Sequence, residues 1–373
     1  MKKILFIMPT MGGGGAEKSL ITILRNFDYA RYEVSLLLAH ELGVLMDEIP
    51  AEVKVISAFG KTVSLCEKIA YNLSNKFHLH FFERWFIRRK IPFGFDTIIS
   101  FCEGRALKMH GYICDKGKRN ISWVHTDLVK NHYTIGAYLT EHQERKLYRK
   151  MDEIVVVSEQ AHNAFVSLFP FSTNKSQVIR NLFEKDHIWE MSQAPCEHIN
   201  RFVFCCVGGL RYVKGFDRMI QVAAKLKKDD RKFLVRIVGE GQERANLEQL
   251  IADLNVHDEV KLEGFSKNPY CYMRESDCFV LSSRVEGYPI VLGEAMVLGK
   301  PIIACECTGS VEMLVGGKYG VLVSQGVESL FEACCTMMDD ISYRSRYATL
   351  AAEGSKLFDS DKILNQIYKV ITL

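Results

Sequence analysis

Residues 278–304 read CFVLSSRVEGYPIVLGEAMVLGKPIIA and carry the clearest structural pattern of the chain. Short apolar runs at 278–281 and 301–304 have the length and composition of buried strands. Between them, Pro289 suits the first turn of a helix and Gly299 suits a helix end, so we predict a helix there. A strand, a helix and a further strand in this order are typical of a parallel α/β sheet.

The same alternation continues on both sides of this stretch. Further strands are predicted over 4–8, 34–39, 97–101, 120–124, 154–158, 202–207, 233–238 and 260–262. Further helices are predicted over 16–26, 218–227 and 244–255. A polar segment at 191–200 separates two such series, and 373 residues are too many for one hydrophobic core. We therefore expect an α/β fold of two doubly wound, Rossmann-like domains with a cleft between them, and ligands at the carboxyl ends of the strands.

The composition is that of a soluble globular protein, with 48% hydrophobic and 25% charged residues. No run of about 18 apolar residues appears, so we expect no membrane-spanning helix. The apolar run after Lys3 stops at Pro9, too early for a secretory signal. Twelve cysteines without a CxxC pair do not suit a zinc site and favour a reducing cytoplasm. We therefore expect a cytoplasmic protein without a bound metal.

The net charge of +3 is unevenly distributed along the chain. The part through Lys185 has 26 Lys and Arg against 19 Asp and Glu, a net +7, and the remainder has a net −4. Residues 76–90 (KFHLHFFERWFIRRK) mix basic and aromatic side chains, as segments on anionic membrane surfaces do. A helix whose aromatic side chains pack into the core is the alternative. The modest charge and the absence of a recognisable module argue against nucleic-acid binding.

The segment 286–294 (EGYPIVLGE) has the chemistry of a site for a diphosphate sugar. A helix that begins near Pro289 presents free backbone N–H groups and the positive end of its dipole, which bind phosphate. Glu286 lies just before the helix and can reach a sugar hydroxyl. Glu294 lies about two turns further on and can accept hydrogen bonds from ribose. The alternative is an acidic residue at the helix start and an exposed helix glutamate.

Three other stretches follow predicted strands. The turn 208–215 (GGLRYVKG) offers glycines for a close phosphate approach and the charges of Arg211 and Lys214. Residues 12–15 are four glycines, which suit a sharp bend or a backbone against a ligand, although the GxGxxG pattern of nicotinamide-binding proteins is missing. His125 follows another predicted strand. Each stretch can also be a plain strand–helix turn, and a lone histidine is more often structural than catalytic.

These residues together resemble glycosyltransferase family four, the large group of retaining enzymes with the two-domain GT-B fold. The resemblance spans most of the chain and is strongest from 204 to 323. The matching segments, in order, are 238–241, Glu286 and Glu294 with seven residues between them, 294–301, 308–312 and 319–323. The resemblance implies an acceptor-binding domain over 1–190, a nucleotide-sugar-binding domain over 201–355, and a C-terminal helix over 356–373 that packs back towards the N-terminal domain.

The resemblance also implies a reaction. A hexose or N-acetylhexosamine would move from a nucleotide diphosphate sugar, usually a UDP-sugar, to a glycan or lipid-linked acceptor, with retention of configuration and without a metal or cofactor. His125 would lie beside the donor sugar, Lys214 would neutralise the diphosphate, and Glu286 would hold sugar hydroxyls. Further donor contacts are implied for Gly14, Gly15, Arg211, Gly239, Phe265, Gly287, Tyr288, Pro289, Ile290, Val291 and Glu294. Such an enzyme would make cell-surface polysaccharide at the inner face of the membrane.

One position departs from the family pattern. Family members usually have an arginine directly after the first glycine of the 208–215 turn, where this chain has Gly209. Arg211 is the candidate to replace that arginine. A weakly active subunit that binds a nucleotide sugar therefore stays open as an alternative. A sugar-nucleotide epimerase on the same fold stays open as well, since it would need a donor but no acceptor.

Overall fold

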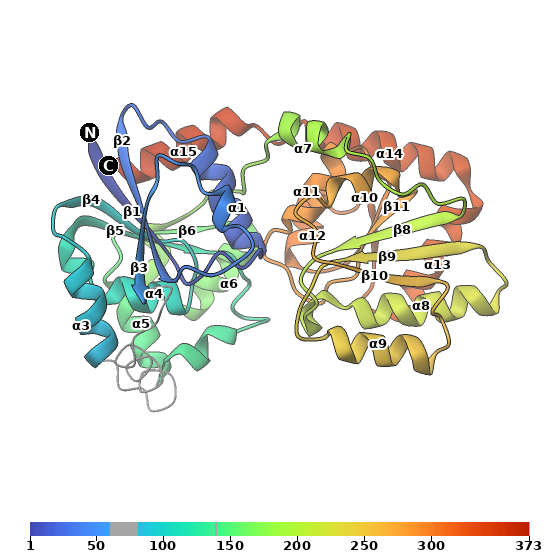
Figure 1. The fold of residues 1–373 in the computed structure, drawn as a ribbon, viewed down its shortest axis with the longest axis horizontal. Helices are drawn as coiled ribbons and strands as arrows, with labels where there is room; N and C mark the ends of the chain where they lie inside the picture. Colours follow the sequence, from blue (N-terminus) through green and yellow to red (C-terminus); the bar gives the residue numbers. More distant parts are fainter. Residues whose placement is uncertain (60–80, 139, 373) are drawn as a thin grey trace. The chain divides into compact units, whose positions relative to one another are not determined.

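The computed structural model describes residues 1–372 apart from 60–80 and 139. The chain forms two compact units: unit 1, Met1–Leu182 with Asp361–Leu373, and unit 2, Phe183–Ser360. Figure 1 shows a sheet with helices on both faces in each unit. All strand pairs between named strands of the described residues are parallel. The expected fold of two doubly wound, Rossmann-like domains is therefore confirmed.

Unit 1 has, in the described part of the chain, a seven-stranded sheet with the order β3-β2-β1-β4-β5-β6-β7. Its strands are β1 (Lys2–Met8), β2 (Tyr32–His40), β3 (Lys54–Phe59), β4 (Phe95–Ser100), β5 (Gly117–Val124), β6 (Glu153–Val156) and β7 (Ser176–Val178). Its helices are α1 (Gly15–Arg25), α3 (Phe81–Lys90), α4 (Arg105–Gly111), α5 (Glu141–Arg149), α6 (Glu159–Leu168) and, at the C-terminus, α15 (Ser360–Thr372). The strand order reverses between β1 and β4, which makes that edge the topological switch point where ligands bind in such sheets.

Unit 2 repeats this arrangement with a six-stranded sheet of order β10-β9-β8-β11-β12-β13 among the described residues. Its strands are β8 (Phe202–Val207), β9 (Phe233–Val238), β10 (Val260–Gly264), β11 (Cys278–Leu281), β12 (Ile302–Cys305) and β13 (Val321–Val323). Its helices are α7 (Lys185–Ser192), α8 (Phe216–Lys228), α9 (Arg244–Asp253), α10 (Tyr270–Glu275), α11 (Ile290–Val297), α12 (Thr308–Met313), α13 (Val327–Asp339) and α14 (Ile341–Ser355). The switch point of this sheet lies between β8 and β11.

The unit boundaries follow from side-chain packing. The Phe183 ring packs on α11 so closely that a Cβ on Gly293 would lie 2.3 Å from its Cζ, and α7 packs on α10 and α11. Unit 2 therefore begins at Phe183, ahead of the polar segment 191–200. At the other end, α15 packs into unit 1 through a stack of Tyr368 on Tyr32, with ring centroids 5.5 Å apart.

The core of unit 2 includes four buried cysteines, Cys206, Cys278, Cys305 and Cys334. Burial raises the pKa of the Cys206 thiol well above its usual value, so this group stays neutral and packs as a small apolar side chain. The eleven cysteines within the described ranges are all free thiols. In the same ranges, no helix combines the length and apolarity that a membrane crossing requires.

Candidate active site

The predicted donor residues of unit 2 lie at its switch point. Strand β8 leads into the turn 208–215, and strand β11 leads into the loop 282–289 and then α11. The two strands are hydrogen-bonded neighbours, with Cys278 opposite Phe204. Both loops therefore leave the same edge of the sheet side by side, where an α/β sheet binds its ligand.

Lys214 and Glu286 meet between these two loops. The Lys214 ammonium donates a hydrogen bond to Glu286 Oε1 at 2.6 Å, and the Ser283 hydroxyl donates to the same oxygen at 2.6 Å. The side chains of Lys214 and Glu286 are 24% and 11% exposed. The structure thus brings together the two unit 2 residues that the sequence singles out for catalysis. Ser283 was missed, although its position three residues before Glu286 was a usable signal.

Arg284 fastens the two loops to each other. Its guanidinium forms two hydrogen bonds with the Asp217 carboxylate, at 2.8 and 2.6 Å, and lies over the Tyr212 ring with 4.0 Å from Cζ to the centroid. Its backbone N–H donates to the Val213 carbonyl at 2.7 Å. Burial acts to raise the pKa of Asp217, but the hydrogen bonds and charge of Arg284 together hold that pKa below its usual value. Sequence reasoning missed both partners, because two charged side chains 67 positions apart give no local pattern.

Helix α11 begins where the sequence predicts it, with Pro289 as the residue before the first helical turn and not within that turn. Gly299 follows its C-terminal end with a positive φ of 61°, as expected of a helix-terminating glycine. The backbone N–H of Gly309, in α12, donates a hydrogen bond to the Glu286 carbonyl at 3.0 Å. A Cβ on Gly309 would come within 2.8 Å of the Gly287 carbonyl oxygen. This close approach fixes the loop that carries Glu286.

Glu294 lies inside unit 2 with 2% of its surface exposed. The Tyr270 hydroxyl donates to Glu294 Oε1 at 3.0 Å. The interpretation of Glu294 as an exposed helix residue is therefore wrong. Tyr270 is a second residue that sequence reasoning missed, because α10 is short and lies 24 positions away in the chain.

The remaining donor residues line these loops or the neighbouring ones. Tyr288 is buried, whereas Ile290 and Val291 are half-buried in the first turn of α11. Phe265 directly follows β10 and is 39% exposed. Packing alone requires a glycine at position 239, because a Cβ there would lie 1.9 Å from the Gly208 carbonyl oxygen. The roles of these residues in donor binding stay predictions.

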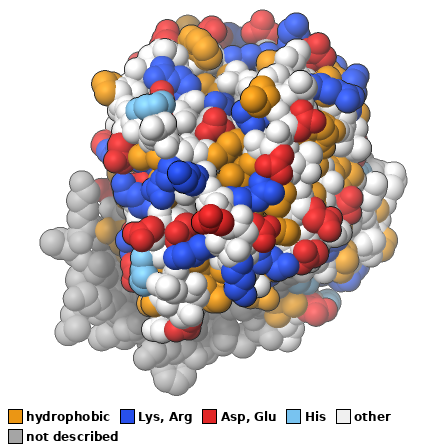
Figure 2. Space-filling view, turned by 90° about the vertical axis from the view of Figure 1, so that its right-hand side faces the viewer, with side chains coloured by type: hydrophobic (Ala, Val, Ile, Leu, Met, Phe, Trp, Pro, Cys, Tyr) orange, Lys and Arg blue, Asp and Glu red, His pale blue; other side chains and the backbone are white. Residues whose placement is uncertain are grey.

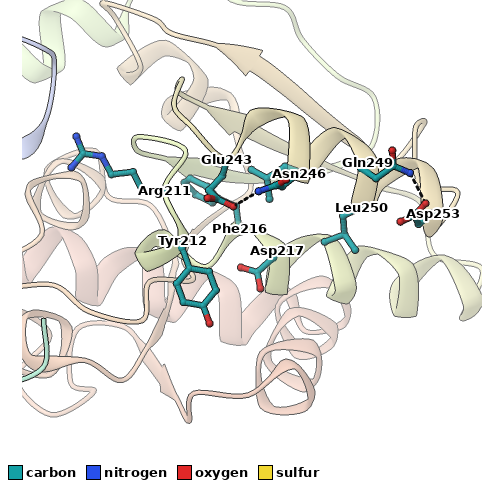
Figure 3. Close-up of a pocket in the computed structure, with 10 residues that line it drawn as sticks. Arg211, Tyr212, Phe216, Asp217, Glu243, Asn246, Gln249, Leu250 and Asp253 are labelled. Atoms are coloured by element: carbon teal, nitrogen blue, oxygen red, sulfur yellow. Dashed lines mark hydrogen bonds between the residues drawn. The ribbon is translucent and has the colours of Figure 1, made fainter. Parts of the chain in front are cut away.

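Arg211 lies at a pocket of about 370 Å³ that shares Tyr212 and Asp217 with the loop contacts of Arg284. Figure 3 shows this pocket at the turn before α8 and along α8 and α9. The residues that line it are Arg211, Tyr212, Phe216, Asp217, Glu243, Asn246, Leu247, Gln249, Leu250 and Asp253. In this view Arg211 extends away from Tyr212 and Asp217. Its Nε lies 3.8 Å from the position that a Cβ on Gly209 would take. The Arg211 side chain therefore passes directly beside Gly209.

The other predicted residues lie in unit 1. His125 directly follows β5, and its ring packs on the Phe101 ring with 5.1 Å between centroids. Burial lowers the pKa of His125, so the imidazole is neutral at pH 7. Gly14 precedes α1 and Gly15 is its first residue. A Cβ on Gly14 would lie 2.5 Å from Glu17 Oε2, which places a carboxylate at this turn.

Two Rossmann-like units, one with a lysine–glutamate pair at its switch point, define the GT-B class of glycosyltransferase. Residues 13–186 match the family model "Glycosyltransferase Family 4", and residues 188–353 match the model "Glycosyl transferases group 1". The chain belongs to glycosyltransferase family four, and it is a glycosyltransferase.

Named relatives agree with this assignment. The chain is 27% identical to a 4-alpha-N-acetylgalactosaminyltransferase of Campylobacter jejuni, over 100% of both chains; that enzyme's name specifies a diphospho-undecaprenol acceptor. It is 28% identical to an amylovoran biosynthesis glycosyltransferase of Erwinia amylovora, over 59% of this chain and 62% of that one. Among solved structures, Anabaena HepE in complex with UDP and glucose has a TM-score of 0.77 at 22% identity, with 100% of both chains covered. This last similarity concerns the fold.

Proposed function

We propose that this glycosyltransferase moves a hexose or N-acetylhexosamine from a UDP-sugar to a glycan or lipid-linked acceptor, with retention of configuration. The observation that carries the proposal is the contact between Lys214 and Glu286 beside the start of α11. The ammonium and the helix N–H groups supply positive charge for the leaving diphosphate. The carboxylate supplies an acceptor for the hydroxyls of the sugar.

The names of similar proteins support the choice of substrates. HepE was solved with UDP and glucose, which supports a UDP-sugar donor. Relatives named for amylovoran and for lipopolysaccharide core synthesis support a role in cell-surface polysaccharide. The diphospho-undecaprenol acceptor in the name of the Campylobacter enzyme supports a lipid-linked acceptor. The cytoplasmic face of the membrane, as the site of the reaction, is part of the proposal.

In the proposed reaction the protein positions its substrates and stabilises charge. The acceptor hydroxyl attacks the sugar on the face that the diphosphate leaves, and a phosphate oxygen takes the proton. Lys214 loses its contact with Glu286 when it turns to the diphosphate, which leaves the Glu286 carboxylate available for a sugar hydroxyl. Glu294 and Tyr270 hold the ribose. In this scheme Lys214 and the start of α11 supply the positive charge at the leaving diphosphate, and no separate cofactor takes part.

The test begins with a thermal-shift screen of UDP-sugars, because a ligand that binds the folded state raises the melting temperature. The UDP-sugar that stabilises the protein is then assayed for transfer to a diphospho-undecaprenol acceptor. Glu286→Gln should lower transfer strongly, while Glu248→Gln, which changes an exposed glutamate on α9, should leave it unchanged. An isomerised sugar from the donor alone would favour the epimerase. Binding without transfer would favour a binding subunit.

The second part of the proposal concerns docking to an anionic membrane through α3. Phe81 is 74% exposed, and Phe82 and Trp85 are each 47% exposed, whereas Phe86 packs against the core of unit 1. The predicted docking segment began at residue 76, and its first five residues lie outside the described part of the chain. Exposed aromatic side chains on a basic helix suit the headgroup region of a bilayer.

The structure identifies which arginines test this docking. Arg88 is bonded to the Asp115 carboxylate at 2.5 and 2.7 Å, so reversing its charge would disturb the fold. Arg84 and Arg89 are exposed. We expect Arg84→Glu/Arg89→Glu to abolish sedimentation with phosphatidylglycerol vesicles. The matched control Lys146→Glu/Lys150→Glu reverses two exposed lysines, one in α5 and one directly after it, and should have little effect. Unchanged sedimentation of the first variant would reject docking through α3.

A further inference from the structure

The segment before β8 and the helix α10 bring two cysteine side chains together in unit 2. The side chains of Cys196 and Cys271 share a hydrogen bond. Cys271 is 7% exposed, whereas Cys196 is half-buried and both of its sequence neighbours, Pro195 and Glu197, are exposed. A thiol close to the surface therefore contacts a thiol in the interior, and both are free thiols in this structure.

Contacts on both sides of Cys196 hold it against α10. Arg274 donates a hydrogen bond to Gln193 Oε1 at 2.8 Å, and His198 Nδ1 lies 3.6 Å from Glu275 Oε2. The first contact lies before Cys196 in the chain and the second lies after it. The segment therefore stays at α10 through groups other than the two thiols.

A buried cation lies beside Cys196. Arg236, in β9, is 2% exposed, and its Nη1 lies 3.9 Å from Cys196 Sγ. The same guanidinium donates to Glu263 Oε1 at 2.6 Å and lies over the ring of Tyr272, with 4.7 Å from Cζ to the centroid. Tyr272 directly follows Cys271, so both cysteines converge on this guanidinium. A cation stabilises a sulfur that acts as a negatively charged nucleophile, which favours Cys196 for the attack on an oxidant.

Cys271 has the surroundings of the second thiol in such a reaction. Burial, followed by the charge and the hydrogen bond of Cys196, raises the pKa of Cys271 to about 11, so this thiol is neutral at pH 7. Its Sγ donates a hydrogen bond to the Asn268 carbonyl at 3.4 Å. A thiol held next to an accessible, reactive cysteine is the arrangement in which oxidation ends in a disulfide.

We propose that Cys196 and Cys271 form a redox modification site, which a hydroperoxide converts into a disulfide. Cys196 Sγ attacks one oxygen of the peroxide, the O–O bond breaks, and the products are a sulfenic acid and a molecule of water or alcohol. Cys271 Sγ then attacks the sulfenic sulfur, and the hydroxyl group leaves with the Cys271 proton as water. The two sulfurs together lose two electrons to the peroxide, and a dithiol reductant restores both thiols.

This inference does not depend on the identity of the sugar donor or acceptor. The number of free thiols leads us to expect a reducing compartment, where a disulfide forms transiently and senses oxidants. The modification would join the segment before β8 to α10 within unit 2 whenever hydroperoxide rises, and it would be reversed when the oxidant is gone.

Peptide mapping of the wild-type protein tests the site directly. The folded protein is treated with hydrogen peroxide, its remaining thiols are alkylated, and it is digested without reductant. We expect one cross-linked peptide that contains Cys196 and Cys271 and is lighter by two hydrogen atoms than the separate peptides together. Dithiothreitol should remove it. Cross-links that join other cysteines instead, or oxidation of Cys196 that dithiothreitol does not reverse, would overturn the proposal.

Single variants separate the roles of the two sulfurs. In Cys271→Ser the sulfenic acid at Cys196 has no thiol to react with, so dimedone should label Cys196 strongly in this variant and weakly in the wild type. In Cys196→Ser the buried Cys271 should stay reduced. Cys335→Ser, which changes another half-buried cysteine on α13, should leave the cross-link unchanged. Equal dimedone labelling of Cys196 in the wild type and Cys271→Ser would show that Cys271 does not react with it. The wild-type peptide map decides the question if a variant does not fold.

Discussion

The six strands of the unit 2 sheet follow the same order as the first six strands of the unit 1 sheet, yet the loops at the two switch points carry different side chains. In unit 2, the Glu286 carboxylate is bonded to the Lys214 ammonium and the Ser283 hydroxyl. In unit 1, the Glu103 carboxylate accepts a hydrogen bond from the His125 backbone N–H at 3.0 Å and lies beside the neutral His125 ring, with no cation bonded to it among the described residues. The shared topology places the loops of each unit at its switch point, and the side chains on those loops determine which chemical groups can bind there.

The largest expected effect concerns the cation of unit 2. Lys214→Ala removes the charge proposed to stabilise the leaving diphosphate, and one such contact contributes about 2.7–4 kcal/mol to the transition state. We expect kcat to fall roughly a hundred- to thousandfold in steady-state transfer assays. Lys225→Ala, which breaks an exposed pair with Glu328 on α13, should leave kcat unchanged. Near-normal turnover of Lys214→Ala would mean that the Lys214 ammonium does not stabilise the leaving diphosphate, and the two units would then not differ in this function.

The second prediction concerns the stability of unit 1 in acid. His110 is fully buried between Ser100 Oγ and Asn120 Oδ1, at 3.1 and 2.9 Å, and burial lowers its pKa to about 4. An unfolded histidine has a pKa of about 6.5, so between these values the unfolded chain binds a proton that the folded chain does not. Its contribution is complete above about pH 6.5 and falls as the pH decreases towards 4. The loss amounts to about 3 kcal/mol.

Urea unfolding at pH 7 and pH 4 measures this loss. In His110→Gln the pH-dependent loss should shrink by that amount, because glutamine does not titrate. In unit 2 the pKa of Asp217 is lowered, so the stability that its ion pair contributes is present above about pH 3.8 and is lost only at lower pH. An equal pH dependence in the wild type and His110→Gln would show that this histidine does not control the acid response of unit 1.

Most of the sheet architecture was predictable from the sequence, and the exceptions have a physical reason. All ten predicted strands correspond to strands of the structure, because central parallel strands are continuous apolar runs. Among the described strands, those that the sequence did not predict are β3, β7 and β13, which lie at sheet edges. Strands β7 and β13 have three residues each, and the sequence of β7, Ser-Gln-Val, is largely polar. Edge strands need less apolar surface and so leave a weaker pattern.

The candidate site was only half predictable. Lys214, Glu286 and Glu294 were identified, since each belongs to a local motif. Arg284 and Tyr270 were not identified, because their contacts join distant parts of the chain. Ser283 was not identified either, although it lies only three residues before Glu286.

A smaller effect is expected from the contact that fastens the loops of unit 2. Arg284→Ala removes two hydrogen bonds to a partly buried Asp217, so we expect unit 2 to lose about 1–2 kcal/mol in urea unfolding. A double-mutant cycle with Asp217→Ala should give a coupling energy of about 1 kcal/mol. The matched cycle on Arg231 and Asp339, a pair whose aspartate side chain is 61% exposed, should give a coupling near zero. Equal couplings would mean that the loop contact is no stronger than a surface pair.

Surface charge alone offers no substitute for these local contacts. Figure 2 shows Lys and Arg side chains interspersed with Asp and Glu on the face that it draws. Such mixed charge provides no single-sign field there to collect an anionic donor. On the proposed function, the individual cations at the switch point of unit 2 are therefore the groups to test.

The smallest expected effect tests whether Arg211 replaces the arginine that family members have at position 209. Arg211 is exposed, so Arg211→Ala should weaken UDP binding by about fivefold, or ~1 kcal/mol. The double variant Gly209→Arg/Arg211→Ala should restore the affinity. A Cβ on Gly209 would meet its nearest neighbours at 3.7 and 3.8 Å, and no positive φ opposes a side chain there. Calorimetry with UDP measures both variants. Unchanged affinity in Arg211→Ala would mean that no arginine serves this position, and a binding subunit of low activity would then describe the protein better than an efficient transferase.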